Sequence, residues 1–380
     1  MAARRFAFGI AFLVAAACAD AASPFRPPVH VLLPKDFHPV DIAAADFTGD
    51  GITGLVLTGG RNELLVLFGN ARGGFRALPS VPAGSNPAAI AIADMNGDRH
   101  PDVVVANHET DYVTLLLGDG AGSFTPRALH LRSNPHPHAV AVGDFDDDGR
   151  PDIAVDSWGE DRITLLFGKD EWKGPGTPFA IGTRPYHTIV AADLDGDGKA
   201  DLVVANWGKG TVSILMGDGK GGFTHAPGSP FPAGPTPFAA AVADVNGDHR
   251  PDVVVANYSG HVDDTKNDGL TWLRNDGNRR FTPFPKLVSH GDYSSRVTTG
   301  DVNGDGFADC AFPNTNGSSV TLVYGSPAGP RAGETIPTMP APYAIVLADL
   351  DGDGRPDLVV SSQKSDEMLV FMAIGAPTLR

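Results

Sequence analysis

The sequence predicts an all-β protein, a seven-bladed β-propeller with four-stranded antiparallel blades. Three observations predict this fold. A nine-residue acidic motif recurs seven times, at spacings of 48 to 57 residues. Strand-like runs flank the copies of the motif, and the two ends of the chain carry complementary parts of one repeat. No linker interrupts the repeats, so we expect a single propeller domain over residues 22–380.

Residues 1–21 have the features of a signal peptide. Arg4 and Arg5 precede an apolar run at residues 6–17, which is too short to span a bilayer, and small residues follow it. We therefore expect an exported protein, secreted or periplasmic, without a transmembrane segment. Lipid anchoring through Cys18 is the alternative, although Ala15 stands where a lipidation motif usually has Leu.

Each repeat predicts four strands in a fixed order. An Ala-rich alternating run such as residues 89–93 precedes the acidic motif, as the crowded inner strand of a blade requires. Residues 103–106 follow as the second strand and residues 112–117 as the third. A Gly-rich turn then leads to Phe124 and an outer strand containing Pro, which an edge strand tolerates.

The chain ends predict a closed ring. The last repeat ends at residues 368–372, its third strand, and residues 25–31 resemble an isolated fourth strand. Pairing the two would complete the last blade and hide two sheet edges, whereas an open solenoid has no reason to split a repeat. The expected blades span residues 39–86, 87–136, 137–184, 185–236, 237–293, 294–341, and 342–380 together with 25–38.

Six copies of the acidic motif have the donor pattern of a calcium loop. They place Asp or Asn at positions one, three, five and nine, and position seven can add its backbone carbonyl. Ca²⁺ takes roughly six to eight oxygen ligands, and carboxylates this close together repel one another without a cation. We expect up to six Ca²⁺ ions, held by Asp94, Asn96, Asp98, His100, Asp102, Asp144, Asp146, Asp148, Arg150, Asp152, Asp193, Asp195, Asp197, Lys199, Asp201, Asp244, Asn246, Asp248, Arg250, Asp252, Asp301, Asn303, Asp305, Phe307, Asp309, Asp349, Asp351, Asp353, Arg355 and Asp357.

The seven copies are not equivalent. The copy at residues 46–54 has Thr48 at position three and Gly54 at position nine, so we expect it to bind no ion. Arg99 and His249 replace Gly at position six of their loops. A left-handed backbone there costs on the order of 1 kcal/mol without Gly, which predicts weaker binding at these two loops.

These features resemble the FG-GAP/VCBS repeat family, which occurs in integrin α propellers and in many exported bacterial proteins. The resemblance rests on the Leu-Phe-Gly strand ends at residues 67–69 and 166–168, the Gly-rich turns and the acidic loops, and it covers residues 25–380. It implies a propeller with calcium in its loops. It also implies adhesion or ligand binding more often than catalysis, although some relatives attach such propellers to polysaccharide lyases.

A ligand is expected on the rim opposite the acidic loops, where aromatic residues have polar neighbours suited to sugars or to a protein partner. The starts of the blades there contain His136, His138, Tyr186, His187, Phe238, Tyr293, Arg296 and Tyr343. The loops after the second strands contain Trp158, Trp207 and Tyr258, with Asn at 107, 206, 257 and 314. We expect these Asn residues to cap strand ends and the two Trp residues to pack between blades.

The main functional hypothesis is a monomeric binding or adhesion module for an extracellular glycan or protein. The alternative is a polysaccharide hydrolase or lyase, with His138, His187 and Glu160 as weak catalytic candidates. We expect these three side chains to be exposed on the rim rather than catalytic. The net charge of −16 argues against a nucleic-acid partner, because phosphate binding needs a basic surface.

Overall fold

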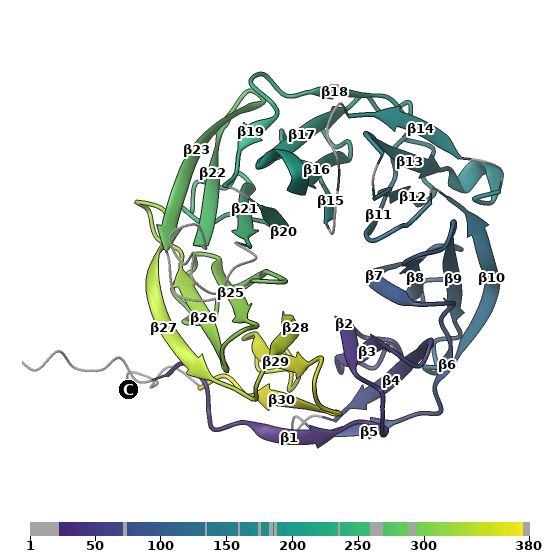
Figure 1. The fold of residues 1–380 in the computed structure, drawn as a ribbon, viewed down its shortest axis with the longest axis vertical. Coiled ribbons are helices and arrows are strands. Elements are labelled where there is room, and N and C mark those ends of the chain that lie inside the picture. Colours follow the sequence, from purple (N-terminus) through teal and green to yellow (C-terminus); the bar gives the residue numbers. More distant parts are fainter. Residues whose placement is uncertain are drawn as a thin grey trace, which may run out of the picture.

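The computed structural model describes residues 23–374, except 71–73, 134, 159, 174–175, 182–184, 186–187, 235, 259–268 and 289–293. It confirms the predicted propeller: seven antiparallel sheets stand around a central axis (Figure 1). The predicted signal peptide, Cys18, Tyr186, His187 and Tyr293 lie outside the described residues. No helix in the described part of the chain is long and apolar enough to cross a membrane.

The first four blades follow one another along the chain. Blade one contains β2 (Pro39–Ala45), β3 (Gly54–Gly59), β4 (Glu63–Gly69), β5 (Phe75–Ala77) and β6 (Val81–Pro82). Blade two contains β7 (Pro87–Ala93), β8 (Asp102–Asn107), β9 (Tyr112–Gly118) and β10 (Phe124–Arg132). Blade three contains β11 (Val140–Gly143), β12 (Asp152–Val155), β13 (Arg162–Leu166) and β14 (Thr177–Ala180). Blade four contains β15 (Ile189–Ala192), β16 (Asp201–Asn206), β17 (Thr211–Gly217), β18 (Phe223–His225) and β19 (Phe231–Pro232).

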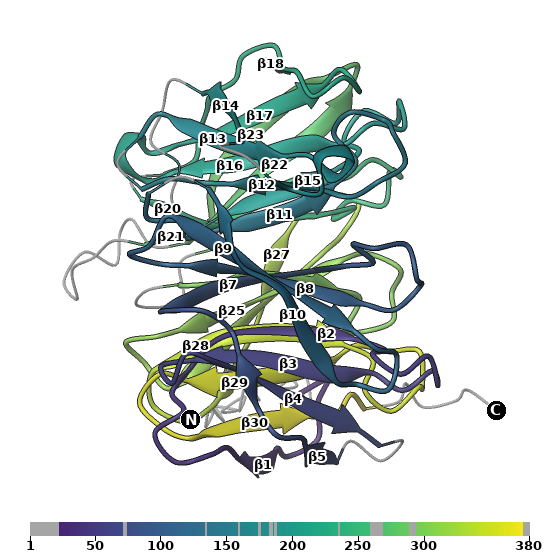
Figure 2. The ribbon, with the colours of Figure 1, turned by 90° about the vertical axis from the view of Figure 1, so that its right-hand side faces the viewer.

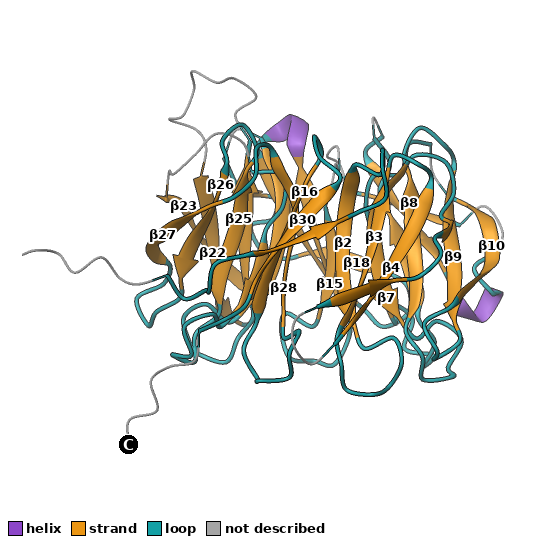
Figure 3. Cartoon of the chain, turned by 90° about the horizontal axis from the view of Figure 1, so that it is seen from below, coloured by secondary structure: helices purple, strands orange, loops and turns teal. Residues whose placement is uncertain are grey.

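The remaining blades close the ring. Blade five contains β20 (Pro237–Ala243), β21 (Asp252–Asn257), β22 (Gly269–Gly277) and β23 (Arg280–Val288). Blade six contains β24 (Thr298–Gly300), β25 (Asp309–Asn314), β26 (Ser319–Tyr324) and β27 (Arg331–Pro337). Blade seven contains β28 (Pro342–Ala348), β29 (Asp357–Ser362), β30 (Glu367–Phe371) and, from the other end of the chain, β1 (Val29–Leu32). Two 3₁₀ helices, η1 (Gly168–Asp170) and η2 (Trp207–Lys209), lie on opposite rims (Figure 3).

The N-terminal strand completes blade seven, as predicted from the split repeat. β1 pairs antiparallel with β30, with Val29 opposite Val370, and it lies at the outer edge of the ring (Figure 2). The carboxylate of Asp366 also accepts the backbone N–H groups of Asp36 and Phe37, at 2.6 and 2.8 Å. β1 therefore becomes the outer strand of blade seven, and β30 is paired on both sides.

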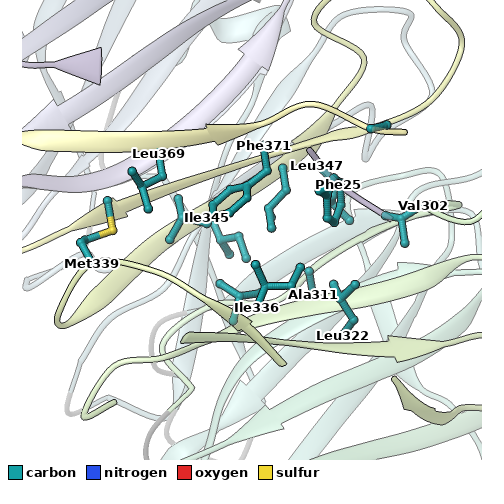
Figure 4. Close-up of a cluster of buried hydrophobic side chains, with 14 residues drawn as sticks. Phe25, Val302, Ala311, Leu322, Ile336, Met339, Ile345, Leu347, Leu369 and Phe371 are labelled. Carbon is teal, nitrogen blue, oxygen red and sulfur yellow. The ribbon is translucent and has the colours of Figure 1, made fainter. Parts of the chain in front are cut away.

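Neighbouring blades pack face to face through buried side chains. In Figure 4, Ile345 and Phe371 of blade seven lie close to Ala311 and Leu322 of blade six. Phe25 of the N-terminal segment is 4% exposed and meets the Phe371 ring edge-on. Burying a side chain of this size contributes roughly 1.5–3 kcal/mol, so packing as well as pairing holds the N-terminal segment to the ring.

Two blades differ in detail from the predicted four continuous strands. In blade one, β5 and β6 both pair with β4, and in blade four, β18 and β19 both pair with β17. Pro79 lies between β5 and β6, and Pro227 and Pro230 lie between β18 and β19. Proline lacks the backbone N–H that a ladder needs, so the outer strand is interrupted while its place in the blade is kept.

Candidate functional site

The acidic loops lie together on one rim, because each joins the first strand of a blade to the second. In the loop at 94–102, the Asp94 carboxylate accepts the N–H groups of Gly97 and Arg99, both at 2.7 Å. Asp98 accepts the N–H of His100 at 2.9 Å. The bond from position six to the first carboxylate recurs in the other six copies, at 2.8 Å in each. The first Asp therefore shapes the turn as well as offering oxygen ligands.

The carboxylate at position nine is buried and connects the loop to its blade. Asp102 accepts the N–H of Met95 through Oδ2 and the N–H of Gly118 through Oδ1, both at 2.8 Å. The same pair of bonds occurs at Asp152, Asp201, Asp309 and Asp357. The sequence pattern assigned position nine to metal binding alone, and this structural role was missed.

Burial makes the position-nine carboxylates hard to ionise. It raises the pKa of Asp102 to about 6 and the pKa of Asp309 to about 7, and the neighbouring loop carboxylates raise both further. The pKa values of Asp152, Asp201, Asp252 and Asp357 are raised to about 6 for the same reasons. A cation beside these groups would favour their ionised form, since an opposite charge offsets the cost of burial.

Three loops bring carboxylate oxygens within 4.8 Å of one another. The clusters are Asp144, Asp146 and Asp152; Asp193, Asp195 and Asp197; and Asp349, Asp351 and Asp353. In the first cluster, Oδ1 of Asp146 is buried without a hydrogen-bond partner in the described part of the chain. Oxygen-only donors with a buried unsatisfied oxygen fit a hard divalent cation such as Ca²⁺.

Positively charged side chains of the protein itself contact these clusters. Lys169, in η1, places Nζ 2.5 Å from Oδ2 of Asp146. Arg279, in the turn between β22 and β23, contacts Asp195 and places Nη2 3.0 Å from Oδ2 of Asp197. The repulsion expected between loop carboxylates is thus partly relieved by the chain's own side chains, and Ca²⁺ would have to displace them at these two loops.

The seventh copy folds into the same turn without the full ligand set. Asp46 accepts the N–H groups of Gly49 and Gly51 at 2.8 Å each. Burial opposes ionisation of Asp46, but these and two further backbone bonds outweigh it and lower its pKa.

The left-handed backbone expected at Arg99 and His249 is confirmed, with φ of 71° and 63°.

A pocket of about 450 Å³ opens on the opposite rim, where the blades start. All seven blades contribute to its wall, which is possible only at the central axis. Its aromatic members are Trp207, Phe238, Tyr258 and Tyr343. Its polar members are Asn86, His108, His138, Arg296 and Gln363.

Three histidines meet at one side of this pocket. The His108 and His138 rings lie 3.8 Å apart between centroids, and His136 lies 6.0 Å from His108. His138 is only 5% exposed, so the expectation of an exposed rim histidine was wrong. Burial, helped by the other two histidines, lowers the pKa of His138 to about 3 and keeps its ring neutral. His138 is buried because the His108 ring, from the loop after β8 of blade two, lies against it.

Arg296 lies at the junction of the pocket and the channel below it, which has a volume of about 320 Å³. Its Nε donates to Oδ1 of Asp41 at 3.3 Å, and its Nη1 donates to the carbonyl of Ser295 at 3.0 Å. The guanidinium carbon lies 5.3 Å from the ring centroid of Tyr343. Asp41 borders the channel rather than the pocket and accepts the N–H of Ile90 at 2.9 Å.

Other rim residues differ in how far they match the predictions. Trp158 and Trp207 are 47% and 37% exposed, so the prediction that they pack between blades was wrong. Glu160 pairs with Arg162 and is not among the described residues that line the pocket. The four Asn residues are buried at strand ends, as expected, and each donates to a hydroxyl of the adjacent strand, for example Asn107 to Thr114 at 3.0 Å.

The sequence reasoning also missed functional candidates. Asn86 precedes a predicted strand and was not predicted as a site residue, and His108 was predicted only as a member of the rim loop after Asn107. Arg296 was noted only as part of a blade start. The available signal was the recurrence of polar residues at equivalent places of different repeats, but the spacing did not tell which of them converge.

Family comparisons match the acidic repeats. An FG-GAP-like repeat model matches residues 46–105, 94–155 and 193–255, and an FG-GAP repeat model matches residues 341–366. Among characterised proteins, integrin alpha-PS2 of Drosophila melanogaster is 32% identical over 102 residues. That match covers 22% of this chain and 7% of the integrin, so the chain spans a small part of this relative.

Several solved propellers share the fold. BBS1N, crystallised with ARL6DN, is 14% identical, with coverage of 94% of this chain and 99% of its own and a TM-score of 0.62. Virginiamycin B lyase from Staphylococcus aureus, crystallised with quinupristin, is 14% identical. The match covers 92% of this chain and 100% of the lyase chain, with a TM-score of 0.58. A lectin from Agrocybe aegerita that recognises non-reducing terminal N-acetylglucosamine is 17% identical, with coverage of 92% and 86% and a TM-score of 0.51. At these identities the likeness concerns the fold alone.

Proposed function

Because the chain belongs to the FG-GAP repeat family, we propose that it is an exported, calcium-binding propeller that acts as a binding or adhesion module. Its ligand is an extracellular glycan or protein, bound at the central pocket on the rim opposite the acidic loops. The proposal rests on the pocket, since all seven blades contribute to its wall and aromatic and polar side chains meet there. A hollow of this size falls within the range of about 300–1,000 Å³ that small ligands occupy.

Calcium has a structural role in this proposal. The six loops with the full ligand set would hold Ca²⁺ through Asp or Asn side chains at positions one, three and five, with the buried Asp at position nine. A bound ion supplies the positive charge that the loop carboxylates need and so stabilises the connection between the first two strands of a blade. The rim bearing the pocket is built by the opposite ends of those strands, which keeps the two functions apart.

The geometry favours binding over catalysis. The described lining residues include His108 and His138 but no carboxylate that could act with them as an acid–base pair. His138 has a pKa near 3, which makes it a weak proton acceptor at neutral pH. Glu160, the other candidate in the described part of the chain, is held by Arg162.

Two tryptophans on the same rim allow a matched test. Trp207 lines the pocket, whereas Trp158 is also exposed but does not. We expect the mature protein in millimolar Ca²⁺ to bind members of a glycan array or a captured extracellular protein, and Trp207→Ala to abolish that binding. Trp158→Ala should retain it. Equal binding by both variants would place the ligand elsewhere, and turnover of the bound glycan would favour the enzymatic alternative.

A further inference from the structure

The charge of the central pocket is opposite to that of the molecule. The chain has a net charge of −16, yet none of the described residues that line the pocket is acidic. Arg296 is the one lining residue in this part of the chain that is always charged. The neighbouring polar groups are the amides of Asn86 and Gln363 and the imidazoles of His108 and His138, all of which can donate hydrogen bonds. A ligand group that accepts hydrogen bonds and carries negative charge therefore fits this wall best.

The guanidinium of Arg296 is held in a fixed orientation. Asp41 accepts from Nε, the Ser295 carbonyl accepts from Nη1, and the ring of Tyr343 lies beneath the guanidinium carbon. The Arg296 side chain is only 16% exposed. An arginine already ordered by its neighbours loses little conformational entropy when a ligand arrives. Asp41 lies on the channel side of the guanidinium, so the pocket side presents the cation.

The aromatic wall indicates what else the ligand contains. Phe238 and Tyr258 meet edge-on at 5.8 Å and form one side of the pocket, with Trp207 beside them in the lining. Such faces stack on the apolar side of a sugar ring, while amides bind its hydroxyl groups. A folded protein needs roughly 800 Å² of contact on each partner, which is far more than the exposed surface of the lining residues of this pocket. The observations therefore favour a glycan over a protein ligand.

We propose that the central pocket binds a glycan through a carboxylate-bearing sugar, with the carboxylate accepting hydrogen bonds from Arg296 and the ring stacked on the aromatic wall. The inference rests on the proposed function, since it names the ligand class of the same pocket. Hydrogen bonds to a charged group are roughly twice as strong as neutral ones. Because Asp41 already neutralises part of the Arg296 charge, we expect a preference of about tenfold for the acidic sugar.

The test compares each acidic glycan with its own methyl ester, which removes the charge and keeps the ring. The probes are array glycans with uronic acid, with sialic acid or with neutral sugars only, measured by titration calorimetry with the mature protein at constant free Ca²⁺. We expect the tightest ligands to be acidic, to lose about tenfold in affinity on esterification, and to weaken as NaCl rises. The uronic and sialic acid arms distinguish the two sources of the carboxylate.

Two substitutions assign the preference to Arg296. Arg296→Gln should bind acid and ester equally, whereas Arg76→Gln, which makes the same charge change on the exposed outer strand β5, should keep the preference. If Arg296→Gln fails to fold, the esterification and salt series on the unmodified protein decide the question. Neutral sugars binding as tightly as acidic ones would overturn this inference and leave the binding module intact. Failure of every glycan to bind would overturn the glycan ligand itself.

Discussion

Replacing Asp102 by Ala tests the structural role of position nine without involving metal. Asp102 is fully buried, and its two oxygens accept the N–H groups of Met95 and Gly118, both at 2.8 Å. The substitution leaves both donors buried without an acceptor. Each unsatisfied donor costs about 1–3 kcal/mol, so we expect the free energy of unfolding to fall by about 2–6 kcal/mol. That is a large share of the ~5–15 kcal/mol typical of a folded protein.

The assay is urea unfolding monitored by tryptophan fluorescence, in EDTA so that no bound Ca²⁺ contributes to stability. Asp98→Ala is the matched control, because Asp98 belongs to the same loop but is exposed, and its carboxylate accepts only from the nearby side-chain amide of Asn96 and backbone N–H of His100. We expect a much smaller shift of the unfolding midpoint for the control. The reasoning is refuted if the two variants unfold at the same urea concentration, since position nine would then matter only through a bound metal.

Three further predictions concern calcium and pH. Millimolar Ca²⁺ should raise the melting temperature over that in EDTA, since a ligand bound only by the native state stabilises by about 2.7 kcal/mol at a concentration of 100 times Kd; unchanged scanning calorimetry traces would rule out structural calcium. Arg279→Gln should tighten Ca²⁺ binding at the loop 193–201, because Arg279 forms ion pairs with Asp195 and Asp197 that Ca²⁺ must displace. Arg280→Gln, at the exposed neighbouring residue, should leave the affinity unchanged. A terbium luminescence titration measures both affinities, and equal values for the two variants would show that Arg279 does not compete with the ion. The pKa of His138 is lowered from 6.5 in the unfolded chain to about 3 in the folded protein. Between these two values only the unfolded chain binds a proton at His138, so the free energy of unfolding falls as the pH is lowered. From pH 7 to pH 5 this costs about 2 kcal/mol, which His138→Phe should abolish in EDTA; parallel pH profiles for the two proteins would contradict the burial argument.

Repetition explains why so much of the fold was predictable. The acidic turn is stabilised within its own nine residues by bonds from Gly or its substitutes to the first Asp, so its conformation could be inferred from local sequence. The four strands of a blade lie close together in the chain, and the alternation of small and β-branched residues indicates them. The pairing of β1 with β30 joins opposite ends of the chain, but the split repeat predicted it.

The sequence by itself determined the number of blades, the closure of the ring and the candidate calcium loops, because these depend on short-range patterns copied along the chain. Only the tertiary structure decided which rim residues meet. The ion pair of Arg296 with Asp41 joins residues 255 positions apart, and the stacking of His138 on His108 depends on how adjacent blades cover each other. The contacts of Arg279 with Asp195 and Asp197 likewise bridge two blades. Spacing in a repeat fixes where a residue stands in its own blade, whereas the chemistry of the pocket arises from side chains of seven blades that converge on one axis.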